Sequence, residues 1–194
     1  MMFLKISIFF SSLFCIFTGC TTSREVLQRP SNAKASSVSI YEFKLLALDG
    51  SKIDFSTYKG KKIIIMNVAS KCGFTPQYAD WEQFYESHKA TVAVLGFPAN
   101  DFLMQEPGSN SSIGEFCQKN YGVTFQMFEK LHVKGSEQAA LYRWLSSENE
   151  NGWNQKTPSW NFCKYLIDEN GQLQAFFPSS IKPTDAEFLK VLGQ

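Results

Sequence analysis

Two short runs dominated by apolar residues constrain the fold of this chain more than any other feature. Residues 63–68 and 91–97 are rich in β-branched side chains, which is typical of strands buried on both faces of a sheet. Between them, residues 77–89 carry aromatic side chains at spacings of three and four, which indicates an amphipathic helix. This order of strand, helix and strand predicts a right-handed crossover between two parallel strands.

Turn signals divide the rest of the chain into further elements. Residues 41–48 and 51–55 flank the turn pair Asp49-Gly50 and predict a β-hairpin near the N-terminus. The sequence then predicts a helix from Ser112 to about Lys119, with Ser112 and Glu115 as a capping box. A strand at 124–133, a helix at 138–147 and a hairpin at 163–167 and 173–177 follow. The last predicted element is a helix at 185–192, capped by Thr184. Together these elements predict an α/β fold of the thioredoxin-like type. It has a central mixed sheet, helices on both faces and an N-terminal β-hairpin.

The first residues have the pattern of an export signal. Lys5 precedes an apolar stretch at residues 6–17, which is shorter than the roughly 20 residues needed to span a bilayer. Small residues before Cys20 resemble the lipobox of bacterial lipoproteins. We therefore expect residues 1–19 to be a lipoprotein signal peptide and Cys20 to carry lipid, anchoring the exported chain to a bacterial membrane on its periplasmic side. The alternative is an ordinary secretory signal, and either route leads to a compartment where disulfides persist.

Composition separates a linker from a domain. Residues 20–39 are polar and lack apolar periodicity, so we expect a flexible tether that could extend to about 60 Å. Residues 40–194 suit a single domain. The formal net charge is +1 and no basic run is present, which argues against nucleic acid as a partner. Because no two Cys or His residues stand at ligand spacing, neither a metal nor another cofactor is expected.

The cysteines of the domain are Cys72, Cys117 and Cys163, an odd number that requires at least one free thiol. Cys72 follows the first apolar run where a helix is predicted to begin near Thr75. The unpaired N–H groups of a helix N-terminus favour a thiolate, which is the reactive form of cysteine. A small buried core residue is the alternative, but Gly73 and the polar neighbours of Cys72 pack a core poorly, and this favours a chemical role.

Two other thiol chemistries are disfavoured. Disulfide exchange of the thioredoxin kind needs a second cysteine three residues after the first, and Thr75 stands there. A cysteine hydrolase needs an imidazole beside the thiol. The chain has only His88, late on a predicted helix, and His132, in a predicted strand, and both are interpreted as structural.

Several segments, in the same order, resemble the glutathione peroxidases. Residues 67–78 resemble the segment around the active-site residue of that family, in its cysteine-containing form. Residues 95–100 leading to 105–110, and residues 160–166, match two further motifs. The resemblance covers residues 40–192, which is essentially the whole domain.

This resemblance implies a catalytic tetrad of Cys72, Gln105, Trp160 and Asn161. An indole N–H is only a donor, and each amide carries two donor hydrogens. Such donors stabilise a thiolate or the negative charge that grows on a departing oxygen. A second Trp-Asn pair begins at Trp153, but only the pair at Trp160 leads into the predicted hairpin as in the family.

The chain departs from the family pattern around the tetrad. Ala99 stands where the family often has Cys, Asp101 where Gln is usual, and Gln126 where Pro is common. Leu103 and Met104 replace small residues and are expected to make the rim of the site more apolar. The insertion that tetrameric members use for subunit contacts is absent, which implies a monomer.

The implied function is a thiol peroxidase that reduces hydrogen peroxide and organic or lipid hydroperoxides. Cys72 would become a sulfenic acid, and Cys117 would resolve it to a disulfide, as in thioredoxin-dependent members. The alternative for Cys117 is a buried helix residue, and Cys163 is interpreted as structural. The reductant would be a thioredoxin-like protein or glutathione. A different function, that of a membrane-tethered redox sensor or relay, stays open from the sequence.

Overall fold

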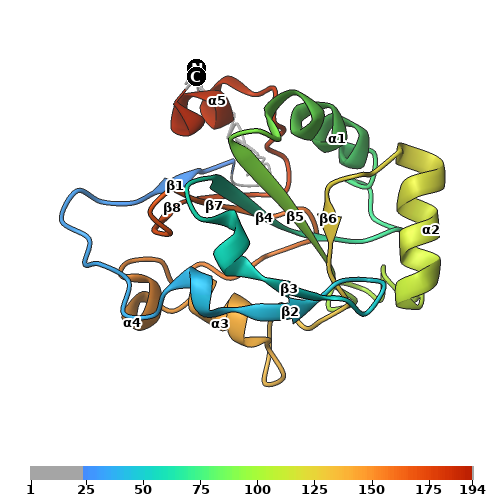
Figure 1. Cartoon of the computed structure of the whole chain (residues 1–194), viewed down its shortest axis with the longest axis horizontal. Helices are drawn as coiled ribbons and strands as arrows, with labels where there is room; N and C mark the ends of the chain where they lie inside the picture. The colour runs from blue at the N-terminus through green and yellow to red at the C-terminus, as the bar shows by residue number, and fades with distance from the viewer. Residues whose placement is uncertain (1–23, 194) are drawn as a thin grey trace, which may run out of the picture.

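Strands β4 (Lys62–Val68) and β5 (Val92–Pro98) lie side by side at the centre of the sheet, where the two apolar runs predict them. The structure is a computed structural model that describes residues 24–193. The two strands are parallel, with Ile63 opposite Ala93. Helix α1 (Gln77–His88) connects them, which confirms the predicted crossover (Figure 1).

The sheet is mixed, as predicted. Its strand order is β1-β8-β7-β4-β5-β6, in which β4, β5 and β6 are mutually parallel and the remaining pairs are antiparallel. The N-terminal hairpin forms a separate sheet of β2 and β3. The remaining elements are β1 (Leu27–Gln28), the 3-10 helices η1 (Ile40–Glu42) and η2 (Phe55–Tyr58), β2 (Lys44–Leu46), β3 (Lys52–Asp54), α2 (Asn110–Tyr121), β6 (Gln126–Met127), α3 (Ala140–Leu145), α4 (Glu148–Asn151), β7 (Lys164–Ile167), β8 (Leu173–Phe177) and α5 (Ala186–Leu192).

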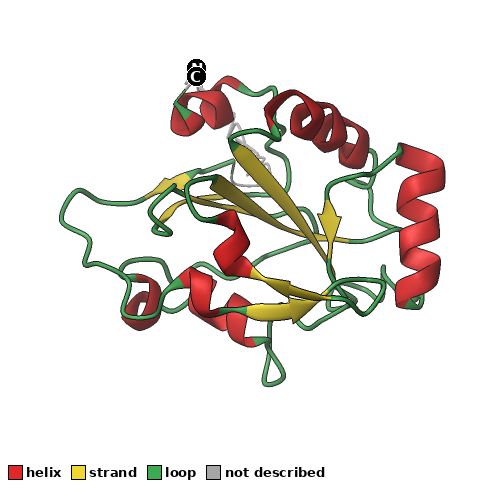
Figure 2. Cartoon of the chain, in the orientation of Figure 1, coloured by secondary structure: helices red, strands yellow, loops and turns green. Residues whose placement is uncertain are grey.

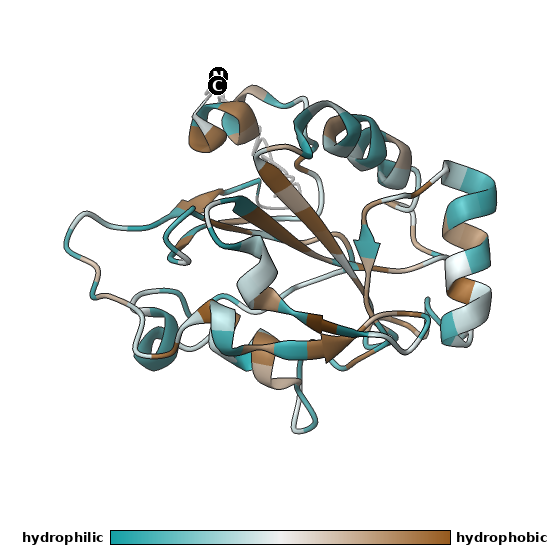
Figure 3. Ribbon diagram, in the orientation of Figure 1, coloured by the Kyte–Doolittle hydropathy of each residue, from teal (hydrophilic) through white to brown (hydrophobic). Residues whose placement is uncertain are grey.

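Each face of the sheet has its own hydrophobic core. Along β4, Ile64 and Met66 pack with α1, α2 and α5, whereas Ile63 and Ile65 pack with η2 and α3. This alternation follows from the two-residue period of a strand. Figure 2 shows helices on both sides of the sheet, and Figure 3 shows apolar residues concentrated in the central strands. The predicted α/β plan with helices on both faces is therefore confirmed.

The predicted strand at residues 124–133 is wrong in length, because β6 has two residues. Beyond β6, two of the N–H groups that a longer strand would have paired are bound by side chains. The Asn110 amide oxygen accepts from the Lys130 N–H at 3.0 Å, and an Asp101 carboxylate oxygen accepts from the Val133 N–H at 2.7 Å. Long-range hydrogen bonds of this kind leave no periodic signal in the sequence.

Three helix boundaries also differ from the predictions. Ser109, not Ser112, caps α2, and its hydroxyl accepts from the Ser112 N–H, so the predicted capping box is wrong. The N-cap of α5 is Asp185 rather than Thr184. The helix predicted at 138–147 is confined to α3.

The predicted flexible tether is wrong for the part that the structure describes. Leu27 pairs with Phe176 across β1 and β8, and the Arg24 guanidinium lies 3.0 Å from the Asp185 carboxylate. Further along, the Ser36 hydroxyl donates to the Glu150 carbonyl at 2.7 Å. Residues 24–39 are polar because they lie over the surface of the domain, where hydrogen bonds and the partly buried Val26, Leu27 and Val38 hold them. The predicted signal peptide and Cys20 lie outside the described residues.

Among residues 24–193, no helix combines the length and the apolar character that crossing a membrane requires.

A glycine in α4's C-cap fixes the N-terminal segment. Gly152 has φ +97°, and a Cβ there would lie 2.1 Å from the Lys34 carbonyl oxygen. Gly135 also has positive φ, +82°, but open space surrounds it. We expect Gly135→Ala to lower the free energy of unfolding by about 1–2 kcal/mol from backbone strain alone. Gly152→Ala adds a clash with the Lys34 backbone, so it should lower the free energy of unfolding by roughly 1–3 kcal/mol more than Gly135→Ala does.

Urea unfolding of both variants checks this difference. Amide hydrogen exchange should also accelerate at Ser36 and Ser37, whose N–H groups are bonded in the native segment, in Gly152→Ala only. Equal destabilisation by the two substitutions would contradict the close approach of Lys34.

Candidate active site

Cys72 lies in the turn between β4 and α1 and is 7% exposed. Its Sγ accepts a hydrogen bond from the Phe74 N–H at 3.4 Å. Helix α1 begins at Gln77, as the aromatic spacing predicts and two residues after Thr75, so the N–H that reaches the sulfur belongs to the turn before the helix. The Phe74 N–H therefore orients the Cys72 side chain within this turn.

Thr75 closes this turn. Its hydroxyl accepts from the Cys72 N–H at 3.0 Å and donates to the Ala69 carbonyl at 2.7 Å. The side chain is buried, so both bonds are shielded from water. The residue that replaces a second cysteine therefore fixes the backbone of the first.

Gln105 and Asn161, which are far apart in sequence, are brought together. The Asn161 Nδ2 donates to the Gln105 Oε1 at 3.0 Å. The Gln105 carbonyl accepts from the Lys71 N–H at 3.0 Å, so the Gln105 loop borders the Cys72 turn. The neighbouring Glu106 carboxylate accepts from both the N–H and the hydroxyl of Ser70, at 2.8 and 3.1 Å. Burial raises the pKa of Glu106.

Asn67, which the sequence reasoning left without a role, positions the segment that contains Trp160 and Asn161. Its Nδ2 donates to the Trp160 carbonyl at 3.0 Å, and its Oδ1 accepts from the Cys163 N–H at 3.2 Å. Its carbonyl accepts from the N–H of Phe162, a residue with φ +64°. A polar residue inside the first apolar run was the signal that could have identified it.

Donor groups remain unused in the site. Among residues 24–193, neither the Trp160 indole N–H nor the Gln105 Nε2 donates to a protein group, and the buried Asn161 Oδ1 has no partner. The Trp160 and Gln105 side chains are half-buried, whereas the Asn161 Oδ1 is a fully buried acceptor, and a buried polar group without a partner is costly. These donors are therefore available to a substrate or to the sulfur.

Leu103 and Met104 stand at the rim, immediately before Gln105. They are 78% and 73% exposed and have positive φ angles of 49° and 54°. Backbone strain at such residues clusters at functional sites. Large apolar side chains are thus presented to solvent beside the Gln105 loop.

Cys117 lies in the middle of α2 and is buried in the same hydrophobic cluster as Cys72. All three cysteines of the domain are free thiols. Burial raises the pKa of Cys117 to about 11. The hydroxyl of Tyr78 lies beside this thiol but forms no hydrogen bond of ordinary geometry. Cys163, by contrast, packs under Ser179, whose Oγ is 3.5 Å from its Sγ.

Lys164 is a buried lysine that was not predicted to have a role, and it binds the start of α1. Its Nζ donates to the Gln77 Oε1 at 2.7 Å and to the Ser179 and Ile181 carbonyls at 3.0 and 2.6 Å. Burial lowers the pKa of Lys164 to about 7. The lysine ties the first residue of α1 to the loop that follows β8.

Neither histidine joins the site. His88 stacks on Phe84 with ring centroids 4.1 Å apart. His132 lies in a loop rather than in the predicted strand, and its Nδ1 is 2.7 Å from an Asp101 oxygen, which raises its pKa. Residues 24–193 contain no group of three or more His, Cys, Asp or Glu side chains arranged to hold a metal ion.

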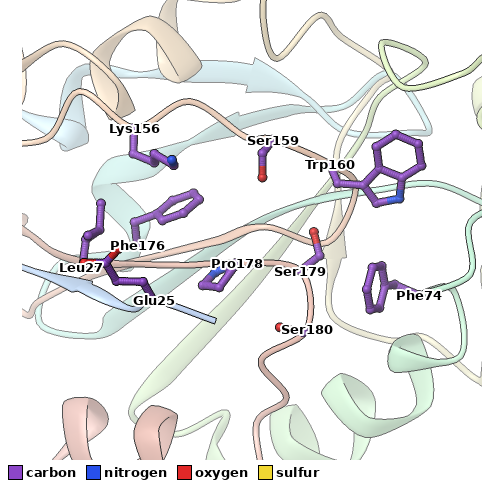
Figure 4. A pocket seen from close by; sticks show the side chains of 10 residues that line it. All are labelled: Glu25, Leu27, Phe74, Lys156, Ser159, Trp160, Phe176, Pro178, Ser179 and Ser180. Atoms are coloured by element: carbon purple, nitrogen blue, oxygen red, sulfur yellow. The ribbon is translucent and has the colours of Figure 1, made fainter. Parts of the chain in front are cut away.

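A pocket of about 540 Å³ opens beside Trp160 (Figure 4). Its lining consists of Glu25, Leu27, Phe74, Lys156, Ser159, Trp160, Phe176, Pro178, Ser179 and Ser180. Figure 4 shows Trp160 and Phe74 facing each other at one end and Leu27 near the other. Because the Phe74 N–H binds the Cys72 sulfur, the Trp160 end of the pocket borders the thiol turn.

Comparison with known proteins places the chain among thiol-dependent peroxidases. The sequence model described as "Glutathione peroxidase" matches residues 40–146. The glutathione peroxidase of Lactococcus lactis is 44% identical over 151 residues, which are 77% of this chain and 96% of that protein. Glutathione peroxidase-like peroxiredoxin 2 of Saccharomyces cerevisiae is 42% identical over 159 residues, 80% and 98% of the two chains.

A thioredoxin family protein from Chlorobium tepidum is similar in fold. The TM-score is 0.57 at 14% identity, over 85% of this chain and 97% of that one. This similarity confirms the predicted thioredoxin-like fold.

The buried lysine predicts a pH dependence of stability. Its pKa is about 7 in the folded state and about 10.4 in an unfolded chain. Between these values the unfolded state binds more protons, so the free energy of unfolding rises with pH. Relative to Lys164→Met, the wild type should gain up to about 1.4 kcal/mol per pH unit from pH 7 to 10.

Urea titrations at several pH values measure this slope. Lys182→Met is the matched control, because Lys182 is exposed and pairs with Asp80 at 2.9 Å, and its curve should run parallel to that of the wild type. Parallel curves for wild type and Lys164→Met would show that Lys164 does not titrate in this range.

Proposed function

The chain belongs to the glutathione peroxidase family and is a thiol peroxidase, and from this premise we propose that Cys72 attacks the peroxide. The substrates are hydrogen peroxide and organic or lipid hydroperoxides. The observation that carries this proposal is the contact between Gln105 and Asn161 beside the Cys72 turn, with donor groups left unpaired.

The first step is a two-electron oxidation of sulfur. The Cys72 thiolate attacks one peroxide oxygen, an S–O bond forms and the O–O bond breaks. The departing oxygen takes a proton and leaves as water or an alcohol, and Cys72 becomes a sulfenic acid. The Trp160 N–H and the Gln105 amide supply hydrogen bonds to the negative charge that grows on the departing oxygen.

In the second step, Cys117 resolves the sulfenic acid. The Cys117 sulfur attacks the Cys72 sulfur, a disulfide forms and water leaves. Since the buried Cys117 has a pKa of about 11, it reacts only after α2 opens locally and exposes the thiol to water. A thioredoxin-like protein then reduces the disulfide by exchange, more efficiently than glutathione does.

We further propose that Cys20 is lipidated and holds the domain, as a monomer, on a bacterial membrane that faces the periplasm. The support is the short apolar stretch that ends in small residues before Cys20. Mass spectrometry of the mature chain from membrane and soluble fractions tests this proposal. An unmodified soluble chain would refute it.

Replacing the nucleophile tests the first step. Cys72→Ser should reduce peroxide at the background rate and should form no trapped sulfenic acid after one equivalent of peroxide. Cys163→Ser is the control, because that thiol is also buried and its Sγ lies beside the Ser159 and Ser179 hydroxyls. Sulfenic acid labelling that persists in Cys72→Ser would disprove the assignment.

The number of turnovers separates the two functions that the sequence leaves open. Many turnovers of peroxide per protein molecule distinguish an enzyme from a redox sensor that is oxidised once.

Replacing the resolving thiol separates the two steps. Cys117→Ser should still consume one equivalent of peroxide, because the Cys72 turn is intact, and then stall when a thioredoxin system is the only reductant. Stopped-flow peroxide consumption and peptide mapping of the Cys72–Cys117 disulfide measure the two effects. Complete thioredoxin-dependent turnover by this variant would assign resolution to another thiol.

A further inference from the structure

A segment that precedes the family domain takes part in the site. The family model begins its match at residue 40, yet Glu25 and Leu27 line the pocket beside Trp160. Strand β1 is held there by the antiparallel pairing of Leu27 with Phe176 and by a hydrogen bond of 2.7 Å from the Arg29 N–H to the Gln174 carbonyl. The segment that contains Glu25 and Leu27 is therefore a fixed part of the fold.

The pocket is much larger than a molecule of hydrogen peroxide. A water molecule occupies about 30 Å³ in the liquid, and hydrogen peroxide adds one oxygen atom. A pocket of about 540 Å³ is within the range of sites that bind organic ligands. Its volume therefore fits a substrate with a substantial organic part.

The chemistry of the lining is that of an alkyl-binding site. Leu27, Phe176 and Pro178 form the part away from the tetrad, and Phe74 and Trp160 form the part next to it (Figure 4). The polar side chains of the lining are short serines, apart from Glu25 and Lys156, both of which are exposed. An unbranched alkyl chain would bury its methylenes between these apolar walls.

We propose that residues 24–30 are a substrate-selecting wall, which with the β8 end of the sheet forms a subsite for the unbranched alkyl chain of an organic hydroperoxide. This inference rests on the proposed function and adds the determinant of substrate preference. The hydroperoxide group lies at the Trp160 end, next to Cys72, and the alkyl chain extends toward Leu27. The reaction at sulfur is unchanged, and the alkyl chain leaves as part of the alcohol.

The test is the dependence of kcat/KM on chain length, measured with hydrogen peroxide and with linear alkyl hydroperoxides of increasing length. Each buried methylene contributes about 0.8 kcal/mol at full burial, so kcat/KM should rise about two- to fourfold per methylene until the pocket is full. A wild-type profile that does not depend on chain length would overturn the proposal.

Variants at Leu27 locate the wall. Leu27→Trp fills the subsite and should move the plateau to shorter chains, whereas Leu27→Ala removes apolar surface and should weaken the gain for the longest chains. The readout is the ratio of kcat/KM for each alkyl hydroperoxide to kcat/KM for hydrogen peroxide, which has no alkyl chain to occupy the subsite. Gln28→Ala is the matched control, because Gln28 lies on the same strand but does not line this pocket.

The outcomes separate this inference from the proposed function. If the wild type reduces no peroxide, the proposed function fails. If it reduces hydrogen peroxide and alkyl hydroperoxides but Leu27 and Gln28 variants share the wild-type profile, only the selecting wall is disproved. Profiles altered in both Leu27 variants and preserved in Gln28→Ala establish it.

Discussion

The side-chain amide of Asn67 connects the central sheet to the segment that carries Trp160 and Asn161. It is fully buried at the end of β4, where an unpaired amide would be costly, and its two ends bind the Trp160 carbonyl and the Cys163 N–H. Because the same strand leads directly into the Cys72 turn, one residue fixes both sides of the site. The positions of the indole and of the sulfur are thereby linked through a rigid strand rather than through flexible loops.

A second set of buried polar contacts completes this frame. Glu106 binds Ser70 and brings the Gln105 loop against the thiol turn, while Lys164 holds the start of α1. Buried polar networks of this kind are expensive unless every member is paired, and they specify one arrangement when they are. The unpaired groups of Trp160, Gln105 and Asn161 lie within this frame, beside the Cys72 turn.

The sequence could predict what local patterns encode. The apolar runs at 63–68 and 91–97 identified the central strands, and long motifs identified the family. The tetrad that the resemblance implies stays a prediction. The polar run at 20–39 was misread because Arg24 and Ser36 find partners more than a hundred positions away. Lys164 was missed for the same reason, since its three acceptors lie on α1 and on the loop after β8. Contacts between distant segments leave no periodicity in one chain.

The docking of β1 alters how far the domain can stand from a membrane. Leu27 is seven positions after Cys20, with six residues between them, and seven residue steps span about 25 Å at most, against the roughly 60 Å of a free tether. If Cys20 carries lipid, the segment that links the lipid to the domain is short. It joins the domain at β1, the edge strand that borders the pocket. The domain then cannot tumble freely, and its pocket stays in the layer of solvent that touches the bilayer. With that anchor, hydroperoxides that leave the lipid phase would meet the thiol before they dilute into the surrounding compartment.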